Sequence, residues 1–534
     1  MSHPHPSSSP RRGRRAFLRG AGLAALATVG AAGLAGCRSA VAVQADAGAG
    51  ADTATRGGNL RVGLRGDLSP AQFLVVGTGA GPLVTGLVYD TLTRYPLTAL
   101  QPQPQLARSW QLSADGLSLG LDLRDDVRFH TGRPFAAADA EFSLRTYADP
   151  RWTAQLRSTA AAITDYEIPD PHRLVLHFAA PLGNIFDLLD LVPILDRESF
   201  ADFTTGANYI GTGPFRLTSR TPNSRIEFER NEHYWQPGRP YLDRVEAAII
   251  PDAQAQLNAL RSGQIDYTGA LSYRDSQRIG RTAGFATTAL DGAESQIYVG
   301  ANVTAPGLGD VRVRRAIAYA LDRNRVMADV YRGTGYPVNL PWPTTSPAYD
   351  AARNATYRRD VGRATALLAQ AGAVPELLLT YIGAEPSHQA VAQIVQSNLA
   401  DAGLRVRLDP VEQTVFLKQL IGAKFPGLWV TGHSFTQFEP STLAVSAYPF
   451  NAAKNASRFS SPAYTAAATS AWHLADPAGP QARDRYSALS GQLLDALFLI
   501  EIGVVVPQIA TAARVRGASA RKGGQPDFTG TYLT

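Results

Sequence analysis

The sequence predicts an α/β protein built from alternating strands and helices. Apolar residues recur at every second position in 119–128 and 225–230, a pattern typical of half-buried strands. In the second half, a strand at 377–381, a helix at 388–402 and a strand at 404–408 follow one another. We find no repeat of fixed period, and after residue 37 no run of about 20 apolar residues that could span a membrane.

Further elements follow from the same patterns. Strands are expected at 57–63, 174–178, 245–250 and 504–510, and helices at 136–147, 254–261, 311–330, 361–371 and 482–499. The segment 311–330 is expected to form one amphipathic helix, because Val313, Ile317 and Leu321 recur at helical spacing. Gly372 suits the C-terminal cap of the helix that precedes it.

The net charge of the chain comes from its first residues. Of 534 residues, 45% are hydrophobic and 18% are charged, and the formal net charge is +6. Residues 1–36 contain five arginines and no acid, and without them 46 basic and 45 acidic residues remain. A nearly neutral chain lacks the electrostatic footprint of a nucleic-acid-binding protein, so we expect no nucleic-acid partner. The length predicts roughly two to four domains.

Residues 1–37 have the organisation of an export signal. The segment RRAFLR at 14–19 follows a polar start and resembles the twin-arginine motif. The motif residues are Arg14, Arg15, Phe17 and Leu18. The 17 residues from Gly20 to Gly36 carry no charge but are only mildly apolar, which favours a cleaved segment over a permanent membrane span.

Cys37 is the only cysteine in the sequence, and it closes this signal. It follows Leu-Ala-Gly at 34–36, and LAGC resembles a bacterial lipobox. Small residues before the cut let a peptidase grip the backbone, and the thiol carries the diacylglycerol. We therefore predict lipidation of Cys37, a flexible tether at 38–56, and a folded part held at the outer face of the cytoplasmic membrane. A disulfide is excluded because there is no second cysteine.

From about residue 57 onward, seven sequence blocks resemble the family 5 solute-binding proteins of the peptide/nickel uptake class. The most characteristic block is LDLRDDVRFHTGRPFAAADAEFS at 121–143. The others, in the order of the family, are PQLARSW at 104–110, GTGPF at 211–215, YW at 234–235, PYLD at 240–243, LRSGQID at 260–266 and DVRVRRAIAYALDR at 310–323. No single block is specific, but the ordered set identifies the resemblance.

The resemblance implies a two-lobed periplasmic-binding-protein fold of the class II type, with an extra subdomain in the first lobe. Lobe I would comprise 57–89, 211–290 and 500–534, the extra subdomain 90–210, and lobe II 291–499. Signature residues would then serve mainly the scaffold: Gly132 would set a turn, and Asp139 would cap or pair at a helix start.

The same resemblance implies a function. A large solute would bind between the lobes, and hinge closure would present the loaded protein to a permease. We therefore expect a monomeric, non-enzymatic substrate-binding protein that delivers a peptide or other sizeable polar solute to an ABC permease and its ATPase. The alternatives are a protein of the same fold with a sensing or chaperone role, or a hydrolase.

The resemblance also implies where the solute would bind. In peptide-binding members, lobe II carries a strand and turn that end in an acidic residue and a proline, and GHSFTQFEP at 432–440 matches this stretch. The expected ligand-binding residues are His433, Ser434, Phe435, Thr436 and Glu439, with Trp342 from a loop near the cleft and Phe73 from the side of lobe I. The alternative for His433 is a strand-end histidine that is satisfied by the backbone.

Both anchors of a free dipeptide depart from the pattern of the family. The aspartate that holds a peptide ammonium lies three residues before the acid, where this chain has Thr436, and a neutral hydroxyl cannot supply the missing charge. Dipeptide binders place an arginine after the strand at 377–381, but 377–404 contains no arginine or lysine, and His388 is expected to face solvent. We therefore expect a longer, end-blocked or non-peptidic solute.

The sequence shows no catalytic or metal-binding constellation. Neither H-E-x-x-H nor G-x-S-x-G occurs, and the glycine cluster at 77–81 lacks the preceding βαβ unit of a dinucleotide loop. His172 and His177 have the wrong parity along a strand for a joint pair of metal ligands. We expect no enzyme activity, no metal and no cofactor.

Overall fold

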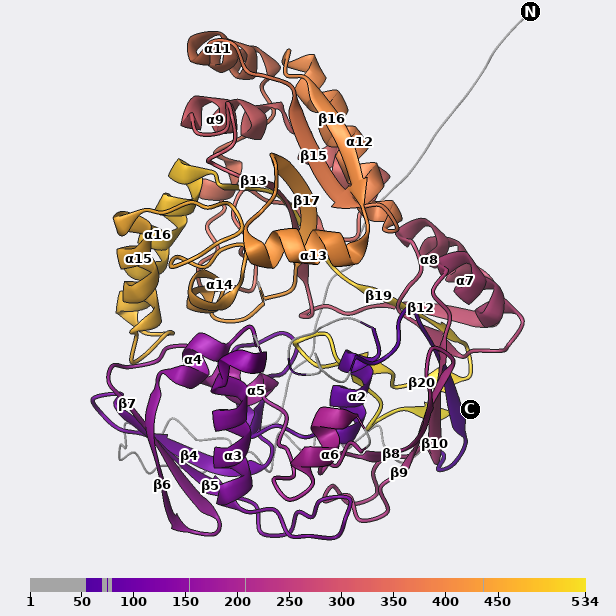
Figure 1. Ribbon diagram of the computed structural model, residues 1–534. Coiled ribbons are helices and arrows are strands. Elements are labelled where there is room, and N and C mark those ends of the chain that lie inside the picture. The colour runs from indigo at the N-terminus through magenta and orange to yellow at the C-terminus, as the bar shows by residue number, and fades with distance from the viewer. Residues whose placement is uncertain (1–53, 70–73, 75–78, 153, 207, 436) are drawn as a thin grey trace, which may run out of the picture. The chain divides into compact units, whose positions relative to one another are not determined.

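The computed structural model describes residues 54–69, 74, 79–152, 154–206, 208–435 and 437–534. Within these ranges, strands and helices alternate around three sheets of four or more strands (Figure 1), which confirms the α/β prediction. None of the helices in these ranges is long and apolar enough to cross a membrane. The twin-arginine motif, Cys37 and most of the tether lie outside the described residues, so those interpretations stay predictions.

The first sheet has seven strands in the order β12-β19-β11-β1-β10-β9-β8. They are β1 (Asn59–Leu64), β8 (Phe215–Thr221), β9 (Arg225–Arg230), β10 (Arg244–Ile249), β11 (Tyr267–Thr268), β12 (Phe285–Ala289) and β19 (Gln508–Ala512). Leu60 and Val62 alternate inward along β1 and share a buried cluster with residues of α2 (Gly81–Val88). Helices α7 (Ala253–Arg261) and α8 (Tyr273–Ile279) follow β10 and β11 in the chain.

The second sheet has six strands in the order β14-β18-β13-β17-β15-β16. They are β13 (Ser295–Ala301), β14 (Tyr336–Pro337), β15 (Leu377–Ile382), β16 (Val406–Val411), β17 (Leu428–His433) and β18 (Leu499–Val505). Its helices are α9 (Val311–Ala320), α10 (Arg323–Asp329), α11 (Val361–Ala371), α12 (Pro386–Asp401), α13 (Gln413–Gly422), α14 (Pro440–Ser446), α15 (Pro462–Trp472) and α16 (Pro480–Ala496). Apart from the short strand β14, the strands and helices of this sheet share one large buried cluster.

The chain passes between these two sheets at 290–294 and at 506–507. Because β12 pairs with β19 and β13 pairs with β18, both antiparallel, the two passages run side by side. The backbone N–H of Leu290 donates to the carbonyl oxygen of Pro507 at 2.9 Å. β18 belongs to the second sheet throughout, so the return to the first sheet lies after Val505 and not at 500, where the predicted lobe boundary falls.

A third sheet of four strands, in the order β4-β5-β7-β6, lies within the predicted extra subdomain. Its strands are β4 (Ala107–Leu112), β5 (Ser118–Leu123), β6 (Ile163–Asp170) and β7 (Arg173–Phe178), and its helices are α3 (Ala137–Ala148), α4 (Arg157–Ala161), α5 (Ile185–Leu191) and α6 (Phe200–Thr205). Leu119 and Leu121 of β5 and Leu174 of β7 are fully buried in its core.

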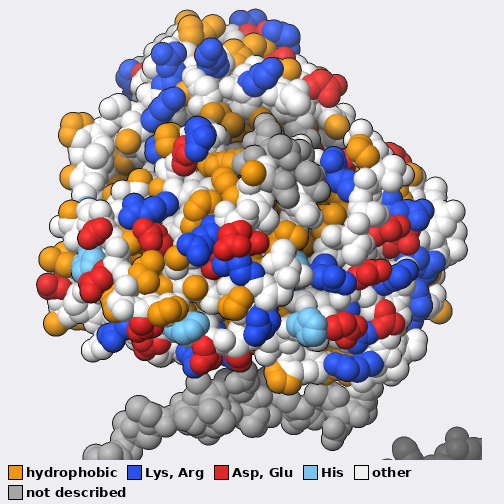
Figure 2. Space-filling view, turned by 60° about the horizontal axis from the view of Figure 1, so that its bottom comes forward, with side chains coloured by type: hydrophobic (Ala, Val, Ile, Leu, Met, Phe, Trp, Pro, Cys, Tyr) orange, Lys and Arg blue, Asp and Glu red, His pale blue; other side chains and the backbone are white. Residues whose placement is uncertain are grey.

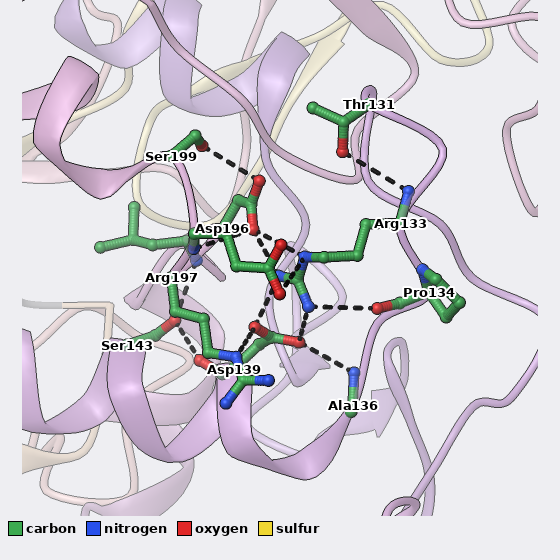
Figure 3. A network of polar contacts seen from close by, with 11 residues as sticks. Thr131, Arg133, Pro134, Ala136, Asp139, Ser143, Asp196, Arg197 and Ser199 are labelled. Atoms are coloured by element: carbon green, nitrogen blue, oxygen red, sulfur yellow. Dashed lines mark hydrogen bonds and ion pairs between the residues drawn. The ribbon is translucent and has the colours of Figure 1, made fainter.

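The signature segment 121–143 holds this subdomain together through Arg133 (Figure 3). The Arg133 guanidinium donates to both carboxylate oxygens of Asp139, at 2.6 and 3.1 Å, and also to Asp196. Asp139 is fully buried and accepts the backbone N–H of Ala136 at 3.0 Å, so it both caps α3 and pairs with a cation. The predicted role of Asp139 at a helix start is therefore confirmed.

Two predicted elements are wrong in the same way. The single helix predicted at 311–330 is two helices, α9 and α10. Leu321 is extended, and the Asp322 carboxylate accepts the N–H of Arg325 at 2.9 Å and begins a new helix. The strand predicted at 504–510 is the end of β18 and the start of β19, interrupted at Pro507, whose nitrogen has no hydrogen to donate.

Candidate functional site

His433 ends β17 and lies opposite Gln296 of β13. Its Nδ1 accepts the backbone N–H of Phe435 at 3.3 Å, so the ring proton lies on Nε2, 3.2 Å from Oε1 of Gln155. Burial lowers the pKa of His433 to about 4, which keeps the ring neutral. One ring nitrogen is thus satisfied by the backbone and the other by a side chain that lies between α3 and α4.

The other predicted site residues lie in different environments. Phe435 is half-buried, packs against the His433 ring at a centroid distance of 5.3 Å, and contacts the buried clusters of both the second and the third sheet. Ser434 is exposed. Thr436 and Phe73 lie outside the described residues. Trp342 is 1% exposed and donates its indole N–H to Ser490 at 2.9 Å, so it packs in the second-sheet core and we leave it out of the site.

Glu439 is buried against Asp187 of α5. Its backbone N–H donates to an Asp187 carboxylate oxygen at 3.1 Å, and its side chain accepts the hydroxyl of Tyr486 at 3.0 Å. Burial and the Asp187 carboxyl raise the pKa of Glu439 to about 8. Burial also raises the pKa of Asp187 to about 7, against hydrogen bonds from Thr442 and Tyr95. The two buried acids therefore hold protons more tightly than ordinary carboxyl groups do.

Three further polar side chains lie beside these residues, and the sequence reasoning missed them. Glu294, Gln296 and Gln437 are 7%, 0% and 4% exposed. One carboxylate oxygen of Glu294, both side-chain polar atoms of Gln296 and the amide oxygen of Gln437 have no hydrogen-bond partner among the described residues. Buried polar groups without partners are rare in folded proteins, and each needs an explanation. We call these three residues the unpartnered trio.

Lys522, in the C-terminal segment, adds a positive charge beside Gln437. Its ammonium donates to the carbonyl oxygen of Leu97 at 2.6 Å, and its own carbonyl oxygen accepts the Gln437 side-chain N–H at 2.8 Å. Burial lowers the pKa of Lys522, and four nearby carboxyl groups oppose that shift. They belong to Glu294, Asp190, Asp187 and Glu439. The site therefore has more acidic than basic groups around this lysine.

The arrangement offers hydrogen bonds and charge but no reactive constellation. Among the described residues, no group of three or more His, Cys, Asp and Glu side chains could hold a metal ion. The predicted solvent-facing His388 is in fact half-buried on α12, and burial lowers its pKa, so it is no permanent cation. On the face shown in Figure 2, the basic side chains of the described residues are interspersed with acidic ones.

Known proteins resemble the chain along most of its length. A family model for bacterial extracellular solute-binding proteins, family 5 Middle, matches residues 101–455. A Brucella ovis protein named for ABC-transporter peptide binding is 27% identical over 321 residues, which cover 56% of this chain and 59% of that protein, less than two thirds. Heme-binding protein A of Haemophilus influenzae is 27% identical over 367 residues, which cover 61% and 64% of the two chains.

Solved structures share the fold. AgaA of A. tumefaciens R10, in complex with agropinic acid, matches with a TM-score of 0.79 and 23% identity, over 89% of this chain and 99% of that one. Bacillus subtilis AppA, in complex with a nonapeptide, matches with a TM-score of 0.79 and 21% identity, over 90% and 100%. These matches confirm the predicted periplasmic-binding-protein fold. Since the family model spans more than half of the sequence, the chain belongs to the bacterial extracellular solute-binding proteins of family 5.

Proposed function

We propose that this protein is the substrate-binding component of an ABC importer and captures a peptide or other sizeable polar solute. The family match over residues 101–455 carries the proposal. The site geometry supports it, because Phe435 and Glu439 contact elements of both the second and the third sheet and so lie where a solute would be enclosed. The partners would be a permease and its ATPase, and the protein would act as a monomer without catalysis.

The fold alone does not select the solute. Proteins with the same fold or family carry names or ligands as different as heme, agropinic acid and a nonapeptide. Thr436 replaces the expected ammonium anchor, and residues 377–404 contain no arginine or lysine. We therefore propose a longer, end-blocked or non-peptidic solute in preference to a free dipeptide.

We also propose that the protein works outside the cytoplasm, tethered to the membrane by lipid on Cys37. The LAGC box at 34–37 and the paired arginines at 14 and 15 support this part of the proposal. Two or more lipid chains provide stable anchoring, whereas a single chain provides only marginal binding. The predicted tether at 38–56 would separate the folded part from the membrane surface.

Native mass spectrometry of protein purified without refolding tests the capture of a solute. A retained small molecule is expected, and adding it back should stabilise the emptied protein by about 2.7 kcal/mol at a hundredfold excess over Kd. His433→Ala should reduce this gain, whereas His177→Ala, which changes a half-buried histidine of β7, should leave it unchanged. If no solute is retained, and no dipeptide, longer peptide, capped peptide, oligosaccharide or chelate raises the Tm, the proposal is wrong.

A further inference from the structure

The unpartnered trio comes from two segments that meet at one end of the second sheet. Glu294 lies two residues before Gln296 in the passage into β13, and Gln296 is the cross-strand partner of His433. Gln437 follows His433 by four residues and donates to the carbonyl oxygen of Lys522. Glu294 lies within electrostatic range of the Lys522 side chain. Gln296 therefore lies beside the predicted site residue His433, and Glu294 and Gln437 lie near Lys522.

Four carboxyl groups lie within electrostatic range of Lys522. Glu294 lies within electrostatic range of Lys522, whose ammonium donates to the carbonyl oxygen of Leu97. Asp190 has Arg94 and Arg521 as additional positive neighbours. Asp187 and Glu439 accept hydroxyl hydrogen bonds and bind protons tightly. Among these four carboxyl groups, only that of Glu294 has a buried oxygen without a hydrogen-bond partner among the described residues.

The atoms without hydrogen-bond partners indicate which chemical group of a solute could bind to them. The Glu294 oxygen and the Gln437 amide oxygen are both acceptors, so they call for donors, and a donor beside a carboxylate is strongest when it is positively charged. The Gln296 amide lacks both an acceptor and a donor, which matches another amide or a similar neutral group that can donate and accept.

We propose that Glu294, Gln296 and Gln437 form a subsite for a cationic group of the solute, an ammonium or guanidinium carried close to an amide. This inference rests on the proposed function, because it names the class of solute that the same site takes. Glu294 and Gln437 accept hydrogen bonds from the cation, and Gln296 exchanges two hydrogen bonds with the neighbouring amide. Glu294 thereby supplies the charge that a threonine at position 436 cannot supply.

The test uses capped tripeptides, acetyl-Ala-Xaa-Ala-amide, in which Xaa is Lys, Arg, Gln or Glu, with affinity measured by isothermal titration calorimetry on the full mature chain. The Lys or Arg peptide should bind at least about tenfold more tightly than the Gln peptide, since a charge-assisted hydrogen bond is worth roughly a factor of ten or more. Glu294→Gln keeps the size of the side chain and should abolish this difference. Glu376→Gln changes an exposed carboxylate of the second half and should preserve the difference.

The outcomes separate this inference from the proposed function. Equal affinity for the Lys and Gln peptides, or tighter binding of the Glu peptide, overturns the cationic subsite and leaves solute capture standing. If none of the peptides binds, the solute retained in native mass spectrometry decides: a cationic solute lost in Glu294→Gln supports the subsite, and a neutral or anionic one overturns it. If no solute of any kind is found, the proposed function fails and the subsite fails with it. Gln437→Met, which removes both the acceptor and the donor to Lys522 without changing the charge, provides a second variant should Glu294→Gln fold poorly.

Discussion

Replacing Glu439 by glutamine should stabilise the protein at pH 8 and leave its stability at pH 4.5 nearly unchanged. Burial and Asp187 raise the pKa of Glu439 to about 8, from an ordinary value of 4.5. A carboxyl group whose folded pKa is raised binds its proton more tightly in the folded state. Its contribution to stability is therefore fully present below the unfolded pKa, and it is lost as the pH rises through the folded pKa. The window for this loss runs from about pH 4.5 to about pH 8.

The size of the effect follows from the shift. One pKa unit corresponds to about 1.4 kcal/mol, so the wild-type protein should lose on the order of 4 kcal/mol of unfolding free energy across this window through the acid pair. Glutamine carries no charge, and its amide oxygen can still accept the Tyr486 hydroxyl. The variant should recover about half of that loss or more at pH 8, because Asp187 then ionises beside a neutral neighbour.

Urea unfolding at several pH values between 4.5 and 8, followed by fluorescence, measures the free energy of unfolding for both proteins. His130 and His433, whose pKa values burial lowers to about 4, destabilise the fold as the pH falls below 6.5, but this effect is common to both proteins and cancels in the difference. Glu412→Gln, which changes an exposed carboxylate before α13, is the control. A difference that does not grow with pH, or a Glu439→Gln protein that is less stable at pH 8, would refute the reasoning.

Three further predictions concern the anchor, the export route and the core. Cys37→Ser should release folded protein from membranes, and palmitate-labelled, membrane-bound mutant protein would contradict the lipobox interpretation. Changing the arginines at 14 and 15 to lysines should leave precursor in the cytoplasm, and undiminished export on cell fractionation would exclude the twin-arginine route. Gly213→Ala should lower stability by about 1–3 kcal/mol, because the new Cβ would lie 2.5 Å from the backbone of α2. Gly120→Ala, where the nearest atom is 3.9 Å away, should have little effect, and equal Tm values for the two variants would contradict the packing argument.

Local periodicity predicted most elements but could not locate every break. The helix predicted at 361–371 has the observed bounds, since its pattern and its closing glycine are local signals. The apolar spacing continues through Leu321 into α10, so periodicity alone concealed the break there. Asp322 could have indicated this break, because an aspartate commonly caps the start of a new helix.

The sequence predicted only part of the candidate site. The segment 433–439 was found because its residues are contiguous and match a family pattern. Asp187 lies 252 residues from Glu439, so nothing in the linear order places the two acids together. In the sequence, Gln296 is an ordinary strand residue. Only the lack of a hydrogen-bond partner in the folded protein distinguishes it. Trp342 shows the converse, because an aromatic residue between two prolines is equally compatible with a cleft and a core.

The paired passages at 290–294 and 506–507 limit how the two large sheets can move. The backbone on either side of each passage is fixed in a strand ladder, so any change in the angle between the sheets must be absorbed by rotation about bonds in these few residues. Pro507 contributes little, since its ring fixes one of its two backbone angles. The longer passage therefore takes most of the rotation, and Glu294 is its last residue. A ligand bound to the Glu294 side chain would therefore contact the segment whose backbone angles set the orientation of the two sheets.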